Sequence, residues 1–272
     1  MRQSITTYTS STKRGAVLNF GPPKTGKTRC CSTLIPLGMV PIWYFDFDGG
    51  DSIEPFIRQA KILNAKDEDI IRFTYQPRRG DRIGETDSRP RGQGKDIFLD
   101  FLKDFNSLFD NVGADGEWNK PGMPKVLVFD TVTSLQDIML DFVLAMAGHD
   151  LGAPKTDARA DFGRAMNKMV ELINSCKSLP VLSIFIAHEK LDKNEVTSEV
   201  RIDPSFQGIL AQQIGREFGT ILYSTTKKVG QDIKYIWMTK PSGLVKSPGL
   251  RHHDNLPLEI EQDYRLVLNL ED

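Results

Sequence analysis

The stretch Gly21-Pro22-Pro23-Lys24-Thr25-Gly26-Lys27-Thr28 decides the fold that this sequence predicts. It fits the pattern G-x-x-x-x-G-K-T, a glycine-rich turn that ends in a lysine and a hydroxyl side chain. Residues 16–20, directly before it, are mostly apolar and typical of a strand, whereas residues 28–34 contain neither proline nor glycine and can form a helix. The pattern is informative only in this order of strand, loop and helix, and both flanks have it.

Such a loop is suited to binding phosphate groups. The backbone N–H groups of the loop and of the following helix converge on one point, where the helix dipole adds a favourable potential for anions. Lys27 would reach the β- and γ-phosphates, and the Thr28 hydroxyl would bind Mg²⁺. We therefore expect ATP and Mg²⁺ as ligands, and a chance match in a glycine-rich turn is the other interpretation. The predicted nucleotide-binding residues are Gly21, Pro22, Pro23, Lys24, Thr25, Gly26, Lys27, Thr28 and Arg29.

Two later apolar runs end in aspartates. Residues 41–47 are almost continuously apolar, as in a strand buried on both faces of a parallel sheet, and they lead into Asp48-Gly49-Gly50. Ligands bind at the carboxyl edge of such sheets, so Asp48 is expected at the ligand-binding edge. Val126–Asp130 is a second such run. Downstream of a phosphate loop this is the Walker B pattern, whose Asp130 would hold Mg²⁺ together with Thr28.

Strands alternate with helices along the chain and are followed by late β-structure. This order predicts an α/β fold with a mostly parallel central sheet flanked by helices and an antiparallel C-terminal β extension. One domain, residues 15–272, suffices because no linker divides two cores, and residues 1–14 are a short polar segment before it. Further strands are expected at 70–75, 181–187, 220–223, 231–239 and 264–270. Helices are expected at 53–61, 97–109, 134–147, 162–176 and 206–218, with Ser134 as an N-cap and residues 190–204 as a polar loop.

Composition places the chain among soluble globular proteins. Its 272 residues are 39% apolar and 26% charged, and a net charge of −1 means that any affinity for nucleic acid must come from a local patch. No apolar run approaches the ~20 residues that span a bilayer, so no membrane partner is expected. Three cysteines without metal-ligand spacing predict neither a metal site nor a disulfide framework. A reduced, cytoplasmic location is the simplest expectation.

Residues 77–95 are a polar insertion rich in glycine and arginine. A stretch of this length without predicted structure is usually functional or disordered. One interpretation is a solvated mobile insertion. The other is a flexible basic arm that contacts nucleic-acid phosphates, with Arg78 and Arg79 among its contacts.

The order of these motifs resembles the RecA-type ATPase core. It is more similar still to the short RecA-core ATPases of bacteriophages, which are known as ATP-binding AAA-domain proteins. Some members of that family promote single-strand annealing and homologous recombination. The resemblance covers residues 16–272 and implies a RecA-like P-loop core. It rests on residues 21–28, the turn Phe45-Asp46-Phe47-Asp48-Gly49, the helix start Asp161-Phe162-Gly163 and the strand end Ile186-Ala187-His188-Glu189.

The resemblance also implies roles in catalysis. Asp48 matches the family's carboxylate that polarises the attacking water, and His188 matches its sensor of the γ-phosphate, while Lys27 acts on the phosphates. Asp48 is shorter than the glutamate often found there, and Asp46 is the alternative base. A strand-end histidine that is satisfied by local hydrogen bonds is the other interpretation of His188.

RecA-type sites are completed by basic residues of a neighbouring protomer, so the resemblance implies a homo-oligomer. It points to Lys240 and Lys246, which could equally be ordinary solvated lysines. It also implies single-stranded DNA as a partner, contacted through loops that hold Lys155, Arg159, Lys193 and Arg201. The segment before the core is short and no C-terminal extension is expected, so a RecA-like filament is not implied, whereas a ring or a transient assembly stays open.

The sequence and the resemblance together predict a Mg²⁺-dependent, DNA-stimulated ATPase that acts on single-stranded DNA in phage recombination, annealing or replication, in the host cytoplasm. A single-strand binding protein or a helicase is an expected further partner. One alternative is a nucleotide-gated loader or interaction module with little hydrolysis. Another is a different P-loop enzyme, either a small-molecule kinase with residues 77–95 as its lid or a packaging-type motor.

Overall fold

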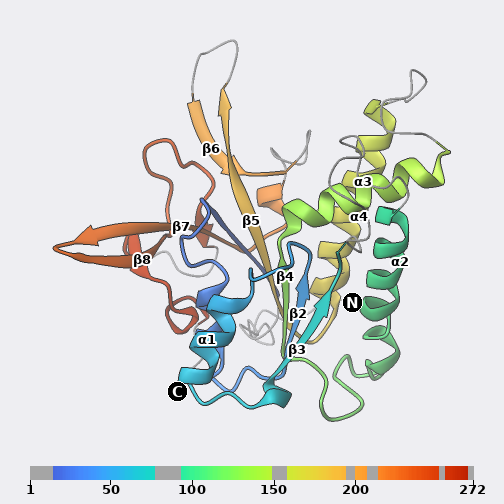
Figure 1. Cartoon of the computed structure of the whole chain (residues 1–272), viewed down its shortest axis with the longest axis horizontal. Coiled ribbons are helices and arrows are strands. Elements are labelled where there is room, and N and C mark those ends of the chain that lie inside the picture. The colour runs from blue at the N-terminus through green and yellow to red at the C-terminus, as the bar shows by residue number, and fades with distance from the viewer. Residues whose placement is uncertain are drawn as a thin grey trace, which may run out of the picture.

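One large sheet organises the molecule. A computed structural model describes residues 15–76, 93–148, 158–193, 200–206, 214–250 and 255–268. Within these residues the sheet has ten strands, with the main order β10-β8-β7-β1-β5-β4-β2-β3, while β6 pairs with β5 and β9 with β7 (Figure 1). In this same part of the chain, no helix combines the length and the apolarity needed to cross a bilayer.

The middle of the sheet is parallel. The register pairs Gly21 with His188 and Asp46 with Asp130. The positions on these strands that carry the predicted site residues therefore lie side by side at one edge of the parallel part of the sheet. The parallel strands are β1 (Gly15–Gly21), β5 (Leu182–Lys193), β4 (Val126–Asp130), β2 (Ile42–Asp46), β3 (Ile70–Thr74) and, on the other side of β1, β7 (Thr220–Val229).

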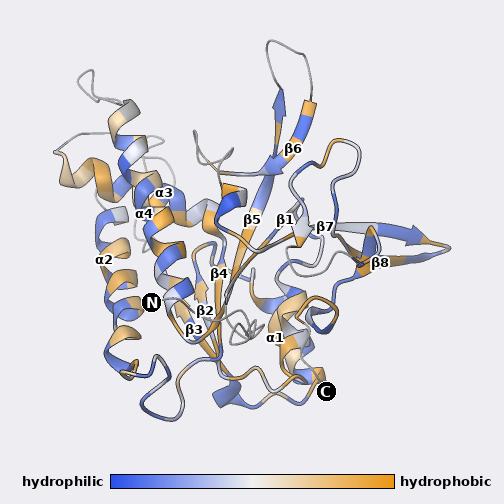
Figure 2. Cartoon of the chain, turned by 180° about the vertical axis from the view of Figure 1, so that it is seen from behind, coloured by the Kyte–Doolittle hydropathy of each residue, from blue (hydrophilic) through white to orange (hydrophobic). Residues whose placement is uncertain are grey.

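Side chains of the parallel strands alternate between two hydrophobic clusters, one on each face of the sheet. On β4, Leu127 and Phe129 belong to the first cluster and Val126 and Val128 to the second. Both faces are therefore buried, which is why the strands read as continuous apolar runs. The first face is covered by α2 (Gln93–Asn106), α3 (Val132–Met146) and α4 (Ala158–Ser178), and the second by α1 (Glu54–Ile62) and the 3₁₀ helix η2 (Arg29–Leu34) (Figures 1 and 2).

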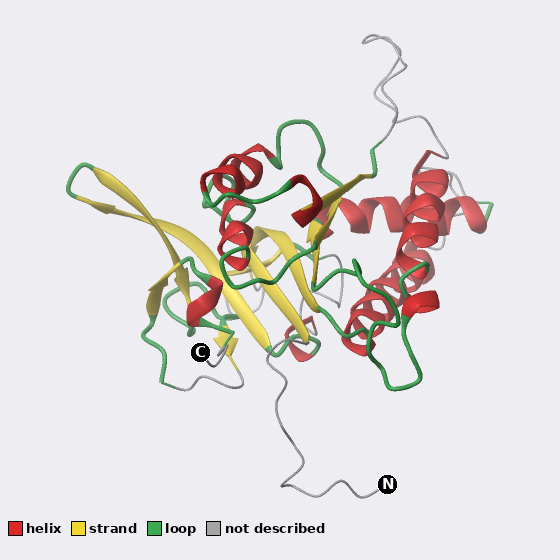
Figure 3. Cartoon of the chain, turned by 90° about the horizontal axis from the view of Figure 1, so that it is seen from below, coloured by secondary structure: helices red, strands yellow, loops and turns green. Residues whose placement is uncertain are grey.

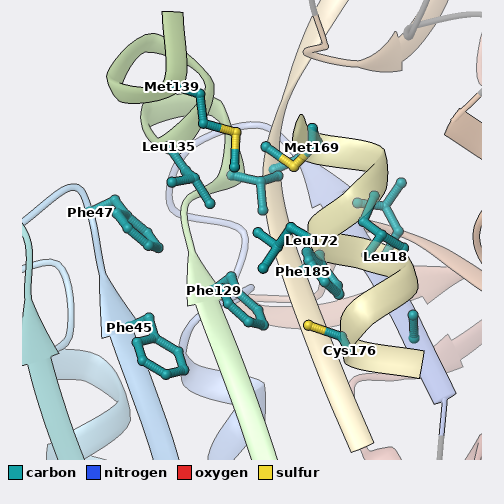
Figure 4. Packing of buried hydrophobic residues seen from close by; sticks show 14 of the residues in the cluster. Leu18, Phe45, Phe47, Phe129, Leu135, Met139, Met169, Leu172, Cys176 and Phe185 are labelled. Atoms are coloured by element: carbon teal, nitrogen blue, oxygen red, sulfur yellow. The ribbon is translucent and has the colours of Figure 1, made fainter. Parts of the chain in front are cut away.

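A row of phenylalanine rings crosses the first face of the sheet (Figure 4). The ring centroid of Phe129 lies 5.1 Å from that of Phe45 and 4.7 Å from that of Phe185, and both pairs are stacked. Leu135 from α3 and Met169 from α4 close over the row, and all five side chains are buried. Because each buried side chain of this size contributes about 1.5–3 kcal/mol, the row holds the site-bearing strands in fixed positions.

The C-terminal part of the sheet is antiparallel. β8 pairs with β7 and with β10, and the β7–β8 hairpin projects from the body of the molecule (Figure 3). The bounds of these strands are Asp232–Met238 for β8, Gly249–Leu250 for β9 and Glu259–Glu261 for β10, while β6 spans Val200–Pro204. The predicted α/β fold, a mostly parallel sheet flanked by helices with an antiparallel C-terminal extension, is confirmed.

Two predictions of local structure after His188 are wrong. Residues 190–193 and 200–204 are not in a loop, because β5 continues to Lys193 and pairs with β6, with Leu191 opposite Ile202, while residues 194–199 lie outside the described residues. This hairpin is mostly half-buried, and its strands carry charged residues that look like a loop in the sequence. Residues 264–268 do not form a strand either: Asp263 caps the 3₁₀ helix η6 (Tyr264–Leu266), and β10, the last strand of the described residues, lies before it.

Two helix starts also differ from expectation. Residues 28–34 form turns and the 3₁₀ helix η2 in place of an α-helix. The N-cap of α3 is Thr131, whose side chain accepts a hydrogen bond from the Ser134 N–H at 3.3 Å, so Ser134 itself is not the cap. Of the predicted helix at 206–218, residues 207–213 lie outside the described residues. The other 3₁₀ helices are η3 (Asp67–Asp69), η4 (Phe109–Asn111) and η5 (Ile214–Arg216).

Candidate nucleotide-binding site

The phosphate loop leaves the end of β1, which lies between β5 and β7. Two glycines give it its path. At Gly21, with φ +151°, a Cβ atom would lie 2.2 Å from the backbone oxygen of Ser224 on β7. At Gly26, with φ +84°, it would lie 2.6 Å from Gln262 Oε1 and 2.8 Å from the ring of Tyr235. The loop is therefore pressed against the C-terminal strands, and no larger residue fits at either position.

Lys27 is folded back onto its own loop. Its Nζ atom donates hydrogen bonds to the carbonyl oxygens of Gly21 at 2.8 Å and Pro22 at 2.6 Å, and the side chain is buried. Burial lowers the pKa of the Lys27 ammonium, although the carboxylates of Asp130 and Glu189 oppose this effect. The Lys27 ammonium therefore lies within the loop, at a position where it would attract anionic oxygens.

Thr28 and Asp130 meet at the edge of the sheet. The Thr28 hydroxyl donates to Asp130 Oδ2 at 2.7 Å, and the buried Tyr44 hydroxyl donates to the same oxygen. Burial raises the pKa of Asp130 to about 6, although the hydrogen bonds from Tyr44 and Thr28 oppose it. A positive charge nearby would favour the ionised carboxylate, and the Thr28 and Asp130 oxygens are hard donors of the kind that Mg²⁺ prefers. The residues present therefore fit a magnesium site.

Asp48 is held by three side chains. Its Oδ1 atom accepts hydrogen bonds from Thr131 Oγ1 at 2.8 Å and from the Ser134 hydroxyl, and its Oδ2 atom lies 3.6 Å from His188 Nε2. Burial alone would raise the pKa of Asp48, but the interactions with His188, Ser134 and Thr131 outweigh it and lower the pKa below the usual 3.8. Asp48 is therefore ionised at neutral pH. Its Oδ1 atom already accepts two hydrogen bonds, and its Oδ2 atom lies beside His188.

Asp46, the alternative base, has a different environment. It is completely buried and forms an ion pair with Arg72, and it accepts a hydrogen bond from the Gly49 N–H at 2.7 Å. Its carboxylate thus ties β3 to the turn that presents Asp48. A carboxylate engaged in this way positions the turn and is not available to a water molecule in the cavity.

A cavity of about 450 Å³ collects these groups. It is lined by the phosphate loop together with Asp48, Asp130, Thr131, His188 and Tyr235. A larger cavity of about 920 Å³ lies beside it and shares two residues with it, Arg29 and Tyr235. The Arg29 guanidinium sits over the Tyr235 ring, 5.2 Å from the centroid. This Arg29–Tyr235 pair therefore borders both cavities.

A family model described as an AAA domain matches residues 13–247. The chain belongs to this AAA-domain family. No curated protein matches it in sequence.

Three solved structures resemble this AAA-domain protein in fold. One is a KaiC-like protein of the archaeon Pyrococcus horikoshii, with 10% identity and a TM-score of 0.42 over 82% of this chain and 77% of that one. The second is the flagellar accessory protein FlaH of Methanocaldococcus jannaschii, with 12% identity and a TM-score of 0.43 over 90% and 83%. The third is the RadB recombinase, with 15% identity and a TM-score of 0.44 over 82% and 79%. These similarities are too low to transfer a substrate or partner.

Of the residues predicted to act in trans or on DNA, the four whose side chains are described do not line the cavity. Lys240 and Lys246 are exposed in the segment after β8. Lys193 is exposed at the end of β5, and Arg201 on β6 forms ion pairs with Asp203 at 2.7 Å and Asp192 at 3.4 Å. Arg78, Arg79 and Lys155, and the side chain of Arg159, lie outside the described residues of the AAA-domain protein.

Sequence reasoning missed three contributors to the site: Tyr44, Tyr235 and Gln262. Tyr44 lies two residues before Asp46 on the same strand, and residues at this spacing share one face of a sheet. This spacing was only a weak indication that Tyr44 contributes to the site. Tyr235 and Gln262 reach the loop from more than 200 residues away in the AAA-domain sequence. No local pattern marks such contacts, because the folding of the sheet alone creates them.

Proposed function

We propose that this AAA-domain protein binds Mg·ATP and hydrolyses it. The observation that carries the proposal is the placing of Asp48, ionised and held by two hydroxyls and His188, in the same cavity as the phosphate loop. A loop alone would support binding, whereas a positioned carboxylate beside it supports attack by water.

The triphosphate is bound by the backbone N–H groups of the loop and by Lys27. To do so, the Lys27 ammonium must give up its hydrogen bonds to the carbonyl oxygens of Gly21 and Pro22 and donate to phosphate oxygens instead. Phosphate oxygens are charged and therefore stronger acceptors. Thr28 and Asp130 would hold Mg²⁺, and the ion would neutralise charge on the phosphate oxygens. The nucleoside extends past Arg29 and Tyr235 into the larger cavity, because these two residues belong to both spaces.

Hydrolysis uses Asp48 to orient the attacking water. Its Oδ1 atom is occupied by Thr131 and Ser134, so Oδ2 accepts the hydrogen bond from water and receives the proton. As the water oxygen bonds to the γ-phosphorus, the bond from that phosphorus to the bridging oxygen breaks, and ADP and inorganic phosphate are the products. His188 lies 3.6 Å from Asp48 Oδ2 and restrains it. Its backbone N–H is fixed by the Thr133 hydroxyl at 3.1 Å, which connects the base to the position of β5.

We further propose that single-stranded DNA stimulates this reaction, in phage recombination, annealing or replication, and that Lys240 or Lys246 completes the site of a neighbouring protomer. One feature supports a link to DNA. The strand β5 that carries His188 continues into the half-buried β5–β6 hairpin with the exposed Lys193 and with Arg201. A polyanion bound to that hairpin would act within a few residues of His188.

Steady-state ATP hydrolysis with and without single-stranded DNA tests the proposal. We expect Mg²⁺-dependent turnover that rises with DNA and is lost in Lys27→Ala. ATP binding without turnover would replace this function by a nucleotide-gated module, and binding that survives Lys27→Ala would contradict the site itself.

A further inference from the structure

Gln262 joins the phosphate loop to the C-terminal strands. It follows β10 and is buried, at 7% exposure. Its side-chain Nε2 atom donates two hydrogen bonds, one to the carbonyl oxygen of Thr25 at 2.8 Å and one to the carbonyl oxygen of Ile236 on β8 at 3.1 Å. A single amide group therefore bridges the loop and the sheet, and both of its N–H donors are used.

The bond to Thr25 matters because of the geometry of a peptide unit. In a trans peptide the C=O and the following N–H point in opposite directions within one plane. Holding the Thr25 carbonyl against Gln262 therefore fixes the Gly26 N–H on the opposite side. Gly26 lacks a side chain and has φ +84°, so little else in its own conformation prevents this peptide from rotating.

The packing around Gln262 gives the contact its rigidity. Its Oε1 atom and the Tyr235 ring lie so close to Gly26 that a Cβ atom there would be 2.6 and 2.8 Å from them. One turn further on, the backbone N–H of Tyr264 donates to Thr33 Oγ1 at 3.0 Å and ties the same C-terminal segment to η2. The segment after β8 therefore packs against the phosphate loop and the helix that follows it.

We propose that Gln262 is a positioning residue of the nucleotide site, which orients the Gly26 N–H toward the phosphates through the Thr25 carbonyl. The inference rests on the nucleotide-binding function proposed above. It assigns a role to a residue that touches neither the metal nor the attacking water, and it makes the C-terminal strands part of the binding machinery.

The test compares Gln262→Met with the wild-type protein by titration calorimetry, using Mg·ATP and inorganic triphosphate as ligands. Methionine keeps the length of the side chain and removes both donors. We expect about tenfold weaker binding of both ligands, the size expected for the loss of one well-placed hydrogen bond. Because inorganic triphosphate has no nucleoside, an equal loss for both ligands locates the defect at the phosphates. Gln262→Glu should bind more weakly still, because it places a carboxylate against the Thr25 carbonyl and near the phosphates.

A matched control is available at Gln136. This glutamine is also buried and donates to two carbonyl oxygens, those of Val132 and Ser205, each at 3.3 Å. Gln136→Met should leave the affinity for both ligands unchanged. If Gln262→Met does not fold, Gln262→Asn, which keeps the amide on a side chain one methylene shorter, gives the same comparison. Wild-type affinity in the folded variants would overturn the inference, whereas a wild-type protein that binds no ATP would overturn the proposed function.

Discussion

The carboxylates of the candidate site differ in which partners surround them. Asp46 forms an ion pair with Arg72, and Asp130 accepts hydrogen bonds from two hydroxyl groups. Asp48 has one oxygen satisfied and the other facing His188. Three acidic groups at one sheet edge therefore have three separate tasks, which follow from their hydrogen bonds and not from their identical chemistry.

Replacing Asp48 tests its task directly. We expect Asp48→Asn to lower kcat for ATP hydrolysis by about 10²- to 10⁴-fold, because the amide cannot accept a proton from water. ATP affinity should change little, since the phosphate loop is intact. The measurement is steady-state turnover beside equilibrium nucleotide binding, with the exposed Asp110→Asn as control. Turnover at the wild-type rate would exclude Asp48 as the base.

The hydroxyl of Ser134 should tune the same carboxylate. Its hydrogen bond helps to lower the pKa of Asp48, so Ser134→Ala should raise that pKa. The ionised form is the active one, and activity is lost as the pH falls through this pKa. The acidic limb of the kcat/KM profile should therefore move to higher pH in Ser134→Ala and stay in place in Ser134→Thr. An unmoved limb in both variants would separate Ser134 from the base.

At the scale of elements, the row of phenylalanines is what holds the site-bearing strands in register. Phe129 lies at its centre, on the strand that ends in Asp130, and it is completely buried. Strand position and site geometry are thus coupled through packing.

Truncating the central ring measures this coupling. Phe129→Ala should lower the free energy of unfolding by about 3–5 kcal/mol, because it leaves a cavity between two neighbouring rings. Phe109→Ala, at a site with 38% exposure, should cost much less. Urea denaturation of both variants gives the comparison, and equal losses would show that the row has no special weight.

The elements also show what a sequence can reveal. The parallel strands were predictable because burial on both faces leaves nearly unbroken apolar runs, as in Val126–Asp130. The β5–β6 hairpin was missed because its half-buried strands carry charged residues such as Lys190 and Lys193, which interrupt the apolar run that marks the buried part of β5. In the candidate site, local motifs pointed to residues that line one cavity, namely the phosphate loop, Asp48, Asp130 and His188, and their roles stay predictions. No motif pointed to Gln262, because its partner Thr25 is 237 positions away.

At the scale of the whole molecule, bound nucleotide should stabilise the native state against unfolding. A ligand present at 100 times its Kd stabilises the native state by about 2.7 kcal/mol. For a chain of this size we expect Mg·ATP to raise Tm by about 5–10 °C. The shift should vanish in Lys27→Ala, whose Tm without ligand should stay near that of the wild type. Differential scanning calorimetry measures the shift. A full Tm shift in Lys27→Ala would contradict the assignment of the nucleotide-binding site.

The bond between Gln262 and Thr25 also sets an order of events during synthesis. The ribosome makes the phosphate loop early and the segment that supports it 237 residues later. At about 5–20 residues per second, this interval lasts roughly 10–50 s. The strands β5 and β7, which flank β1, also emerge late. We therefore expect the nascent chain to carry an unfinished loop that does not hold nucleotide until its last strands have left the exit tunnel.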